Sequence, residues 1–131
     1  MNKTIGFIGS GNMGGAMIGG IIKAGLTAKE NIYVSDINEE SLARVRESYG
    51  VNTTTDNAQL AKVCDIIVLS VKPFLYPVVI NQIKAVVKED VIIVVIAAGQ
   101  SSEAVAQLFG REIKIVKTMP NTPALVGEGM A

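Results

Sequence analysis

Short apolar runs alternate along the chain with longer stretches in which apolar residues recur every three or four positions. The short runs predict buried β-strands, and the longer stretches predict helices with one apolar face. The predicted strands cover residues 5–8, 31–35, 51–54, 65–71, 91–96 and 113–118. The predicted helices cover residues 12–24, 39–49, 56–63 and 74–87, and a last helix starts from Ser101 or Ser102 and ends at Phe109.

This alternation is typical of an α/β domain with a parallel sheet and right-handed crossovers. For six strands we expect the Rossmann-type doubly wound order 3-2-1-4-5-6. The continuous apolar runs at 65–71 and 91–96 predict burial on both faces of the sheet, most of all for the second run. The alternating pattern at 113–118 predicts an edge strand with one wet face. The pair Gly19-Gly20 predicts that the first helix packs closely against the sheet.

A glycine motif, Gly9-x-Gly11-x-x-Gly14, lies between the first strand and the first helix. In this position Gly9 allows a tight turn, Gly11 lets the backbone approach phosphates, and Gly14 lets the helix lie close to the strand. The first N–H groups of the helix have no intrahelical acceptor and favour an anion. The motif predicts a dinucleotide pyrophosphate site; from the glycines alone, a turn without a ligand stays an alternative.

The carboxyl ends of parallel strands lie at one edge of a sheet, where ligands bind in folds of this class. Five segments are predicted to meet at that edge, namely residues 9–14, 35–36, 71–73, 97–99 and 119–121. Asp36 stands where the acid that hydrogen-bonds a ribose 2′-hydroxyl is found in NAD-binding folds. Its alternative role is that of a helix N-cap, which Asn38 could also fill.

Composition narrows the possible functions. Lys and Arg number 12, as do Asp and Glu, so the formal net charge of zero argues against a general binder of nucleic acid. The chain has no histidine and one cysteine, Cys64, which excludes histidine-based catalysis and a cysteine cluster for a metal. Cys64 is expected to be a small buried thiol. No signal peptide or membrane span is predicted, and we expect a cytoplasmic protein.

The chain resembles the pyrroline-5-carboxylate reductase family at residues 6–13, 69–73, 97–99 and 119–129, in that order along the sequence. The most specific of these segments begins Met119-Pro120-Asn121-Thr122-Pro123. The resemblance implies NADPH- or NADH-dependent reduction of 1-pyrroline-5-carboxylate to L-proline, the last step of proline biosynthesis. It also implies that residues 1–118 are the dinucleotide-binding Rossmann domain.

Residues 119–131 would then lead towards a helical dimerisation domain outside this sequence. We therefore expect residues 1–131 alone to be inactive and assign no catalytic residue among them. The intact enzyme is expected to be a homo-oligomer that binds a small-molecule substrate and neither nucleic acid nor a membrane.

The resemblance implies nucleotide contacts at Ile8, Gly9, Ser10, Gly11, Asn12, Met13, Ser35, Asn57, Val71, Lys72, Pro73, Ala97 and Ala98, with Asn121 beside the nicotinamide. Gly14 and Asp36 join this set through the glycine motif and the position of the acid. Lys72 could instead be a solvated loop lysine. Asp36 favours NADH, because a 2′-phosphate would meet its carboxylate, whereas the resemblance favours NADPH.

Hydride transfer needs no protein nucleophile, and an imine can accept a hydride while already protonated, so the absence of histidine fits imine reduction. Two alternatives stay open. One is another NAD(P)-dependent reductase of the β-hydroxyacid dehydrogenase type, which shares the opening glycine motif. The other is a nucleotide-binding module without turnover.

Overall fold

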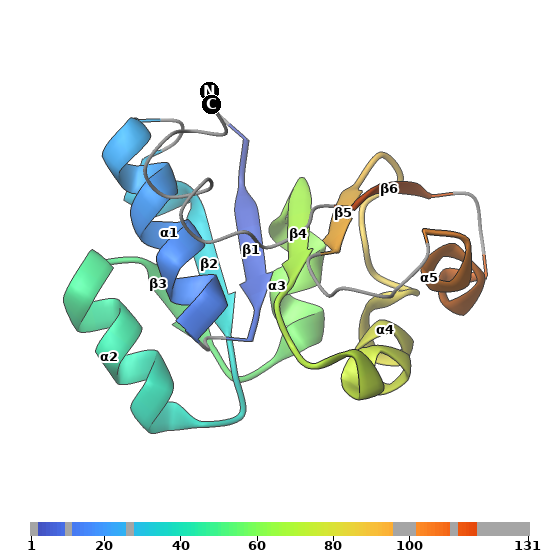
Figure 1. Ribbon diagram of the computed structural model, residues 1–131, viewed down its shortest axis with the longest axis horizontal. Coiled ribbons are helices and arrows are strands. Elements are labelled where there is room, and N and C mark those ends of the chain that lie inside the picture. Colours follow the sequence, from blue (N-terminus) through green and yellow to red (C-terminus); the bar gives the residue numbers. More distant parts are fainter. Residues whose placement is uncertain (1–2, 10–11, 26–27, 96–101, 111–112, 118–131) are drawn as a thin grey trace.

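The computed structural model describes residues 3–9, 12–25, 28–95, 102–110 and 113–117. Its strands form one parallel sheet in the order β3-β2-β1-β4-β5-β6, which confirms the predicted topology (Figure 1). The strands are β1 Ile5–Ile8, β2 Ile32–Ser35, β3 Asn52–Thr54, β4 Ile66–Leu69, β5 Ile92–Val95 and β6 Lys114–Lys117. The helices are α1 Asn12–Ala24, α2 Glu39–Tyr49, α3 Asn57–Val63, α4 Tyr76–Ile83 and α5 Ser102–Phe109, with 3₁₀ turns η1 Lys29–Asn31 and η2 Pro73–Leu75.

Helices cover the sheet from both sides, and the core has two parts. One cluster joins α1 and α2, through residues such as Ile18 and Leu42, to Phe7 of β1. The other joins α3 and α4, through residues such as Leu60 and Ile80, to the opposite face of the same strands. Figure 1 shows α1 and α2 at one side of β1 and α4 and α5 at the other.

Burial along the strands differs from the expectation at one point. β1 is buried throughout, whereas Ile92 and Val94 of β5 are only half-buried, so β5 is not the most buried strand. The lower burial of β5 follows from its position in the sheet, one strand from the edge. Among the described residues, the cluster on the α1 and α2 side draws its fully buried members from strands nearer the middle of the sheet. β6 lies at the sheet edge as predicted, and Val116 on its wet face is 47% exposed.

The predicted helix 74–87 is divided in the structure. Pro77 has no N–H to donate to the carbonyl of Pro73, so residues 73–75 form a separate turn in which Leu75 N donates to Lys72 O at 2.9 Å. Pro77 then stands in the first turn of α4, as expected. After Ile83 the chain continues in turns, with Val86 N donating to Ile83 O at 2.9 Å.

The prediction for Gly19 and Gly20 is wrong. A methyl group at Gly19 would lie 3.3 Å from the ring of Tyr49, so this glycine faces α2 and not the sheet. Gly20 is exposed, with open space beside it. Successive helical residues are rotated by about 100°. The fully buried Ile18 therefore packs towards the sheet, and Gly19 points to another side of the helix.

Candidate functional site

The tip of β1 is held by its two neighbouring strands. Gly9 has φ +102°, a backbone conformation that favours glycine and allows the tight turn after the strand. Its N–H donates to the carbonyl of Ser35 at 2.8 Å, and a methyl group at Gly9 would lie 2.9 Å from Val71 Cγ1. Three of the five predicted segments, at the ends of β1, β2 and β4, therefore meet at one edge of the sheet.

Ser70 reinforces this edge and was not among the predicted site residues. Its Oγ lies 2.9 Å from the carbonyl oxygen of Ile8 and 2.8 Å from that of Gly9, and its N–H donates to Ile8 O at 3.0 Å. The backbone of Ile8 and Gly9 is thereby held from the side of β4. A serine that directly follows the apolar run of β4 is the sequence signal for this role, because a polar side chain there can reach the neighbouring strand end.

The end of β2 carries a short chain of side-chain hydrogen bonds. Ser35 is fully buried, and its Oγ donates to Asn57 Oδ1 at 2.5 Å. Asn57 opens α3, and its Nδ2 donates to Gln82 Oε1 of α4 at 2.7 Å. The structure thus brings together two predicted nucleotide contacts, Ser35 and Asn57, and adds Gln82, which lies 25 residues away in sequence from Asn57.

Asp36 is not the cap of α2. The N-cap is Asn38, whose Oδ1 accepts from Ser41 N at 3.2 Å, and Asp36 Oδ1 accepts from Asn38 N at 2.9 Å. This turn, together with the bond from Asp36 N to Thr54 O at 3.3 Å, fixes the half-buried Asp36 at the end of β2. The local geometry decides the cap in favour of Asn38 and leaves the ribose role of Asp36 a prediction.

The other predicted contacts have the following places. Val71 is half-buried beside Gly9, Lys72 is exposed, and Pro73 begins η2. Asn12, Met13 and Gly14 lie in the first turn of α1, and Ile8, which is buried, ends β1. Ser10, Gly11, Ala97, Ala98 and Asn121 lie outside the described residues, as do the segments 97–99 and 119–121.

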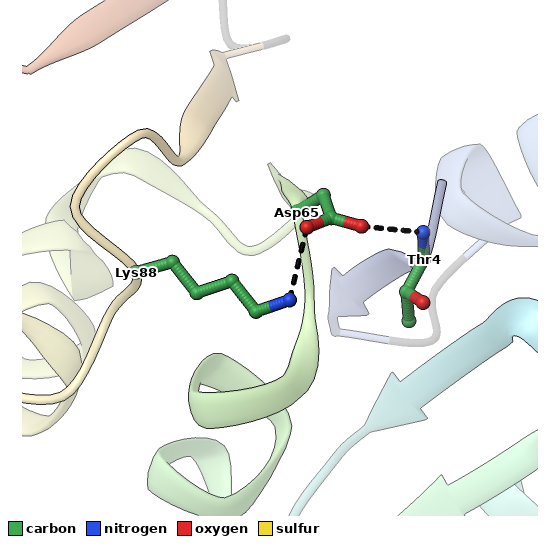
Figure 2. Close-up of polar contacts among 3 residues, drawn as sticks. All are labelled: Thr4, Asp65 and Lys88. Atoms are coloured by element: carbon green, nitrogen blue, oxygen red, sulfur yellow. Dashed lines mark hydrogen bonds and ion pairs between the residues drawn. The ribbon is translucent and has the colours of Figure 1, made fainter. Parts of the chain in front are cut away.

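The opposite edge of the sheet carries an ionic cluster (Figure 2). Thr4 N donates to Asp65 Oδ2 at 3.0 Å, and Lys88 Nζ lies 2.9 Å from Asp65 Oδ1. The Thr4 bond and then the Lys88 bond lower the pKa of Asp65, and the same carboxylate raises the pKa of Lys88. Because these residues precede β1 and β4, the cluster lies away from the strand tips and stabilises the amino edge.

Cys64 lies beside this cluster and is fully buried, as predicted. Burial, and then the charge of Asp65, raise the pKa of its thiol to about 12, so the thiol stays protonated at neutral pH. In the described part of the chain, no group of three or more His, Cys, Asp or Glu side chains could hold a metal ion. None of the helices described there is long and apolar enough to cross a bilayer.

Replacing Asp65 by alanine is expected to lower the free energy of unfolding by about 1 kcal/mol at pH 7, because the Thr4 N–H loses its acceptor. The side chains of Lys88 and Asp65 are 39% and 27% exposed, so solvent screening keeps the ionic part small. A lowered pKa in the folded state means that ionised Asp65 stabilises the fold above its ordinary pKa of about 4. This contribution is lost as the pH falls through the lower, folded value.

Urea unfolding at pH 7, 4 and 2 would measure this effect. The difference between wild type and Asp65→Ala should shrink as the pH falls from about 4 to about 2. Asp90→Ala, which removes an exposed carboxylate near the same edge, serves as the control and should change stability by less than about 0.5 kcal/mol. A difference between wild type and Asp65→Ala that is the same at all three pH values would contradict the assignment.

Comparison with known proteins gives the family. Residues 4–99 match the family model described as NADP oxidoreductase, coenzyme F420-dependent. The chain is 38% identical over 130 residues to pyrroline-5-carboxylate reductase of Escherichia coli, covering 99% of this chain and 48% of the relative. It is 43% identical to the enzyme of that name from Haemophilus influenzae, covering 99% of this chain and 47% of the relative. The chain thus spans about half the length of these relatives.

Solved structures agree with these matches. A pyrroline-5-carboxylate reductase from Coxiella burnetii superposes with a TM-score of 0.88 at 33% identity, covering 95% of this chain and 46% of that one. Plasmodium falciparum pyrroline carboxylate reductase, with NADP bound, gives a TM-score of 0.82 at 36% identity, covering 96% and 45%. The chain therefore belongs to the NADP oxidoreductase, coenzyme F420-dependent, family, and nearly all of it is similar to about half of a pyrroline-5-carboxylate reductase.

Proposed function

We propose that this chain holds NADPH or NADH for the reduction of 1-pyrroline-5-carboxylate to L-proline, as the dinucleotide-binding domain of the reductase that completes proline biosynthesis. The observation that carries the proposal is the turn at Gly9, held between Ser35 and Ser70 at the edge where the strands end. The Plasmodium falciparum relative, which shares this fold at 36% identity, has NADP bound. The domain boundary near residue 118 belongs to the same proposal.

The residues of this chain would bind the coenzyme and orient it. The bound coenzyme supplies the hydride, which goes to the carbon of the substrate C=N bond, and a proton completes the amine. The backbone after Gly9 and the start of α1 suit the diphosphate, because free N–H groups at a helix N-terminus attract an anion. Asp36 and Asn57 at the ends of β2 and β3 suit the adenosine ribose. Lys72, which follows β4, would contribute a charge or a backbone contact near the coenzyme.

The remaining catalytic groups and the expected homo-oligomer are assigned to the part of the relatives that this sequence does not match. A cytoplasmic location is proposed with them, supported by the single free cysteine, which is typical of reducing compartments. The test of the activity is proline-dependent reduction of NADP⁺ or NAD⁺. A version extended to the length of the relatives should show it, and residues 1–131 should not. Nucleotide binding by both without turnover by either would favour a non-catalytic module.

Replacing Asp36 by alanine is expected to shift the coenzyme preference towards NADPH. The carboxylate hydrogen-bonds a ribose 2′-hydroxyl but repels a 2′-phosphate, so its loss weakens NADH binding and favours NADPH. Loss of one charge-assisted hydrogen bond is expected to change the ratio of the NADH and NADPH dissociation constants about tenfold. Titrations of NADH and NADPH against wild type and Asp36→Ala measure it, with Asp90→Ala as a charge-matched control. Equal affinities that the substitution leaves unchanged would remove Asp36 from the site.

A further inference from the structure

The hydrogen-bond chain at the end of β2 fixes one side chain from two sides. Asn57 Oδ1 accepts from the buried hydroxyl of Ser35 at 2.5 Å, and Asn57 Nδ2 donates to Gln82 Oε1 at 2.7 Å. The three residues come from β2, α3 and α4, so no single element determines the arrangement. Because both ends of the Asn57 amide are engaged, its plane has one orientation.

This orientation leaves part of the amide available. A primary amide has two N–H donors and an oxygen with two lone pairs, and the two bonds above use one of each. Within the part of the chain that the structure describes, one Asn57 N–H and one lone pair therefore remain for another partner. Asn57 is half-buried, whereas Ser35 is fully buried, and the described hydrogen bond of its side chain goes to Asn57.

The polarity of the chain depends on which end of its amide Gln82 presents to Asn57. The Ser35 hydroxyl can donate or accept, so by itself it would hold Asn57 equally well with the amide reversed. In the structure Gln82 turns its oxygen, and not its amide nitrogen, towards Asn57, where it accepts from Nδ2 while Oδ1 accepts from Ser35. Gln82 is exposed and lies outside both core clusters, so this bond, and not packing, is its described contact with the site.

The chain also reaches the glycine turn. The carbonyl of the same Ser35 accepts from Gly9 N at 2.8 Å. In doubly wound folds the end of the second strand is where the adenosine ribose lies, next to the glycine turn that holds the diphosphate. Asn57 is thereby tied, through Ser35, to the strand end where that ribose would lie.

We propose that Gln82 is a positioning residue for the adenosine side of the coenzyme. It holds Asn57 so that the second Nδ2 hydrogen faces an oxygen acceptor on the ribose, either a 2′-hydroxyl or a 2′-phosphate. The inference rests on the proposed function, since it concerns the same nucleotide site. It assigns a role in the nucleotide site to a residue of α4, which is not one of the strand ends where the site was predicted.

Four proteins test the proposal: wild type, Gln82→Met, Gln82→Glu and the control Asn81→Leu. Methionine keeps the length of glutamine but cannot replace its oxygen as a strong acceptor, whereas glutamate is only an acceptor and keeps the orientation of Asn57. Asn81 is the exposed neighbour of Gln82 on the same helix, and its change to leucine removes an amide at similar size. NADH is the ligand, because it lacks the 2′-phosphate that the added charge of glutamate would repel.

Gln82→Met should raise the dissociation constant for NADH about fivefold, which corresponds to one net hydrogen bond of about 1 kcal/mol. Gln82→Glu and Asn81→Leu should stay within about twofold of wild type, and the melting temperatures of all four should agree within a few degrees. Retained binding in the glutamate variant separates positioning from a general effect on α4.

Two results would overturn the proposal while leaving the proposed function intact. One is wild-type affinity in Gln82→Met, and the other is a loss in Gln82→Glu as large as that in Gln82→Met. If wild-type affinity in Gln82→Met came with a lowered melting temperature, Gln82 would have a structural role only. If wild type binds neither NADH nor NADPH, the proposed function and this inference both fail.

Discussion

Replacing Gly9 by alanine is expected to abolish coenzyme binding and to lower the free energy of unfolding by about 2 kcal/mol. The φ of +102° at Gly9 is one that residues with a Cβ rarely adopt, at a cost of about 1–3 kcal/mol. The new methyl would also lie 2.9 Å from Val71 Cγ1 and 3.0 Å from the carbonyl oxygen of Ser70. The Ser70 backbone cannot easily retreat, because its N–H donates to Ile8 O.

Two measurements check this prediction, namely urea unfolding and titration with NADH. Gly20→Ala is the matched control, because the same substitution there meets open space on an exposed part of α1. It should leave binding unchanged and stabilise the chain by up to about 1 kcal/mol through helix propensity. Adding Val71→Ala to Gly9→Ala should recover only part of the loss, since the backbone strain stays. A Gly9→Ala chain that binds NADH as wild type does would contradict the proposed role of the turn.

Replacing Gly6 by alanine is expected to lower the free energy of unfolding by about 3 kcal/mol, at the upper end of overpacking effects. Gly6 lies in the middle of β1, and a methyl there would lie 2.5 Å from Leu60 Cδ2 and 2.6 Å from Cys64 Sγ. Leu60 and Cys64 are fully buried under the sheet, so neither can move into solvent. The absence of a side chain at Gly6 is what lets the C-terminal part of α3 lie close to β1.

A double-mutant cycle identifies the cause. Leu60→Ala alone should cost about 3 kcal/mol, as expected for a buried leucine that leaves a cavity. The double variant should be more stable than the sum of the two losses predicts, by about 1 kcal/mol, because the methyl group introduced by Gly6→Ala enters that cavity. The contact with Cys64 Sγ limits the relief. Additive losses, measured by urea unfolding at pH 7, would show that the cost of Gly6→Ala does not come from Leu60.

Several features of the fold follow from patterns within a few residues. Asp56 caps α3, with its Oδ1 accepting from Ala58 N at 2.9 Å, and Gly50 ends α2 with φ +70°. Each depends on a local backbone conformation that particular residue types favour. The strand order likewise follows from the alternation of strands and helices, because right-handed crossovers and short connections leave few other arrangements.

Contacts between elements could not be predicted in the same way. The sequence left the cap of α2 open between Asp36 and Asn38, and only the path of the chain after β2 decided it. It offered no reason to connect Gln82 with Asn57, because that bond depends on how α4 lies against α3. The same holds for the close approach of Leu60 to Gly6 across two elements.

By itself, the sequence determined the alternation of strands and helices, the order of the sheet, the glycine turn after β1 and most helix ends. These properties depend on backbone preferences and on hydrophobic periodicity, which short segments contain in full. Only the tertiary structure decided that Ser70 fixes the turn and that Gln82 and Ser35 orient Asn57. Directional bonds between distant residues depend on register and on the distance between packed elements, and both are set by the core as a whole.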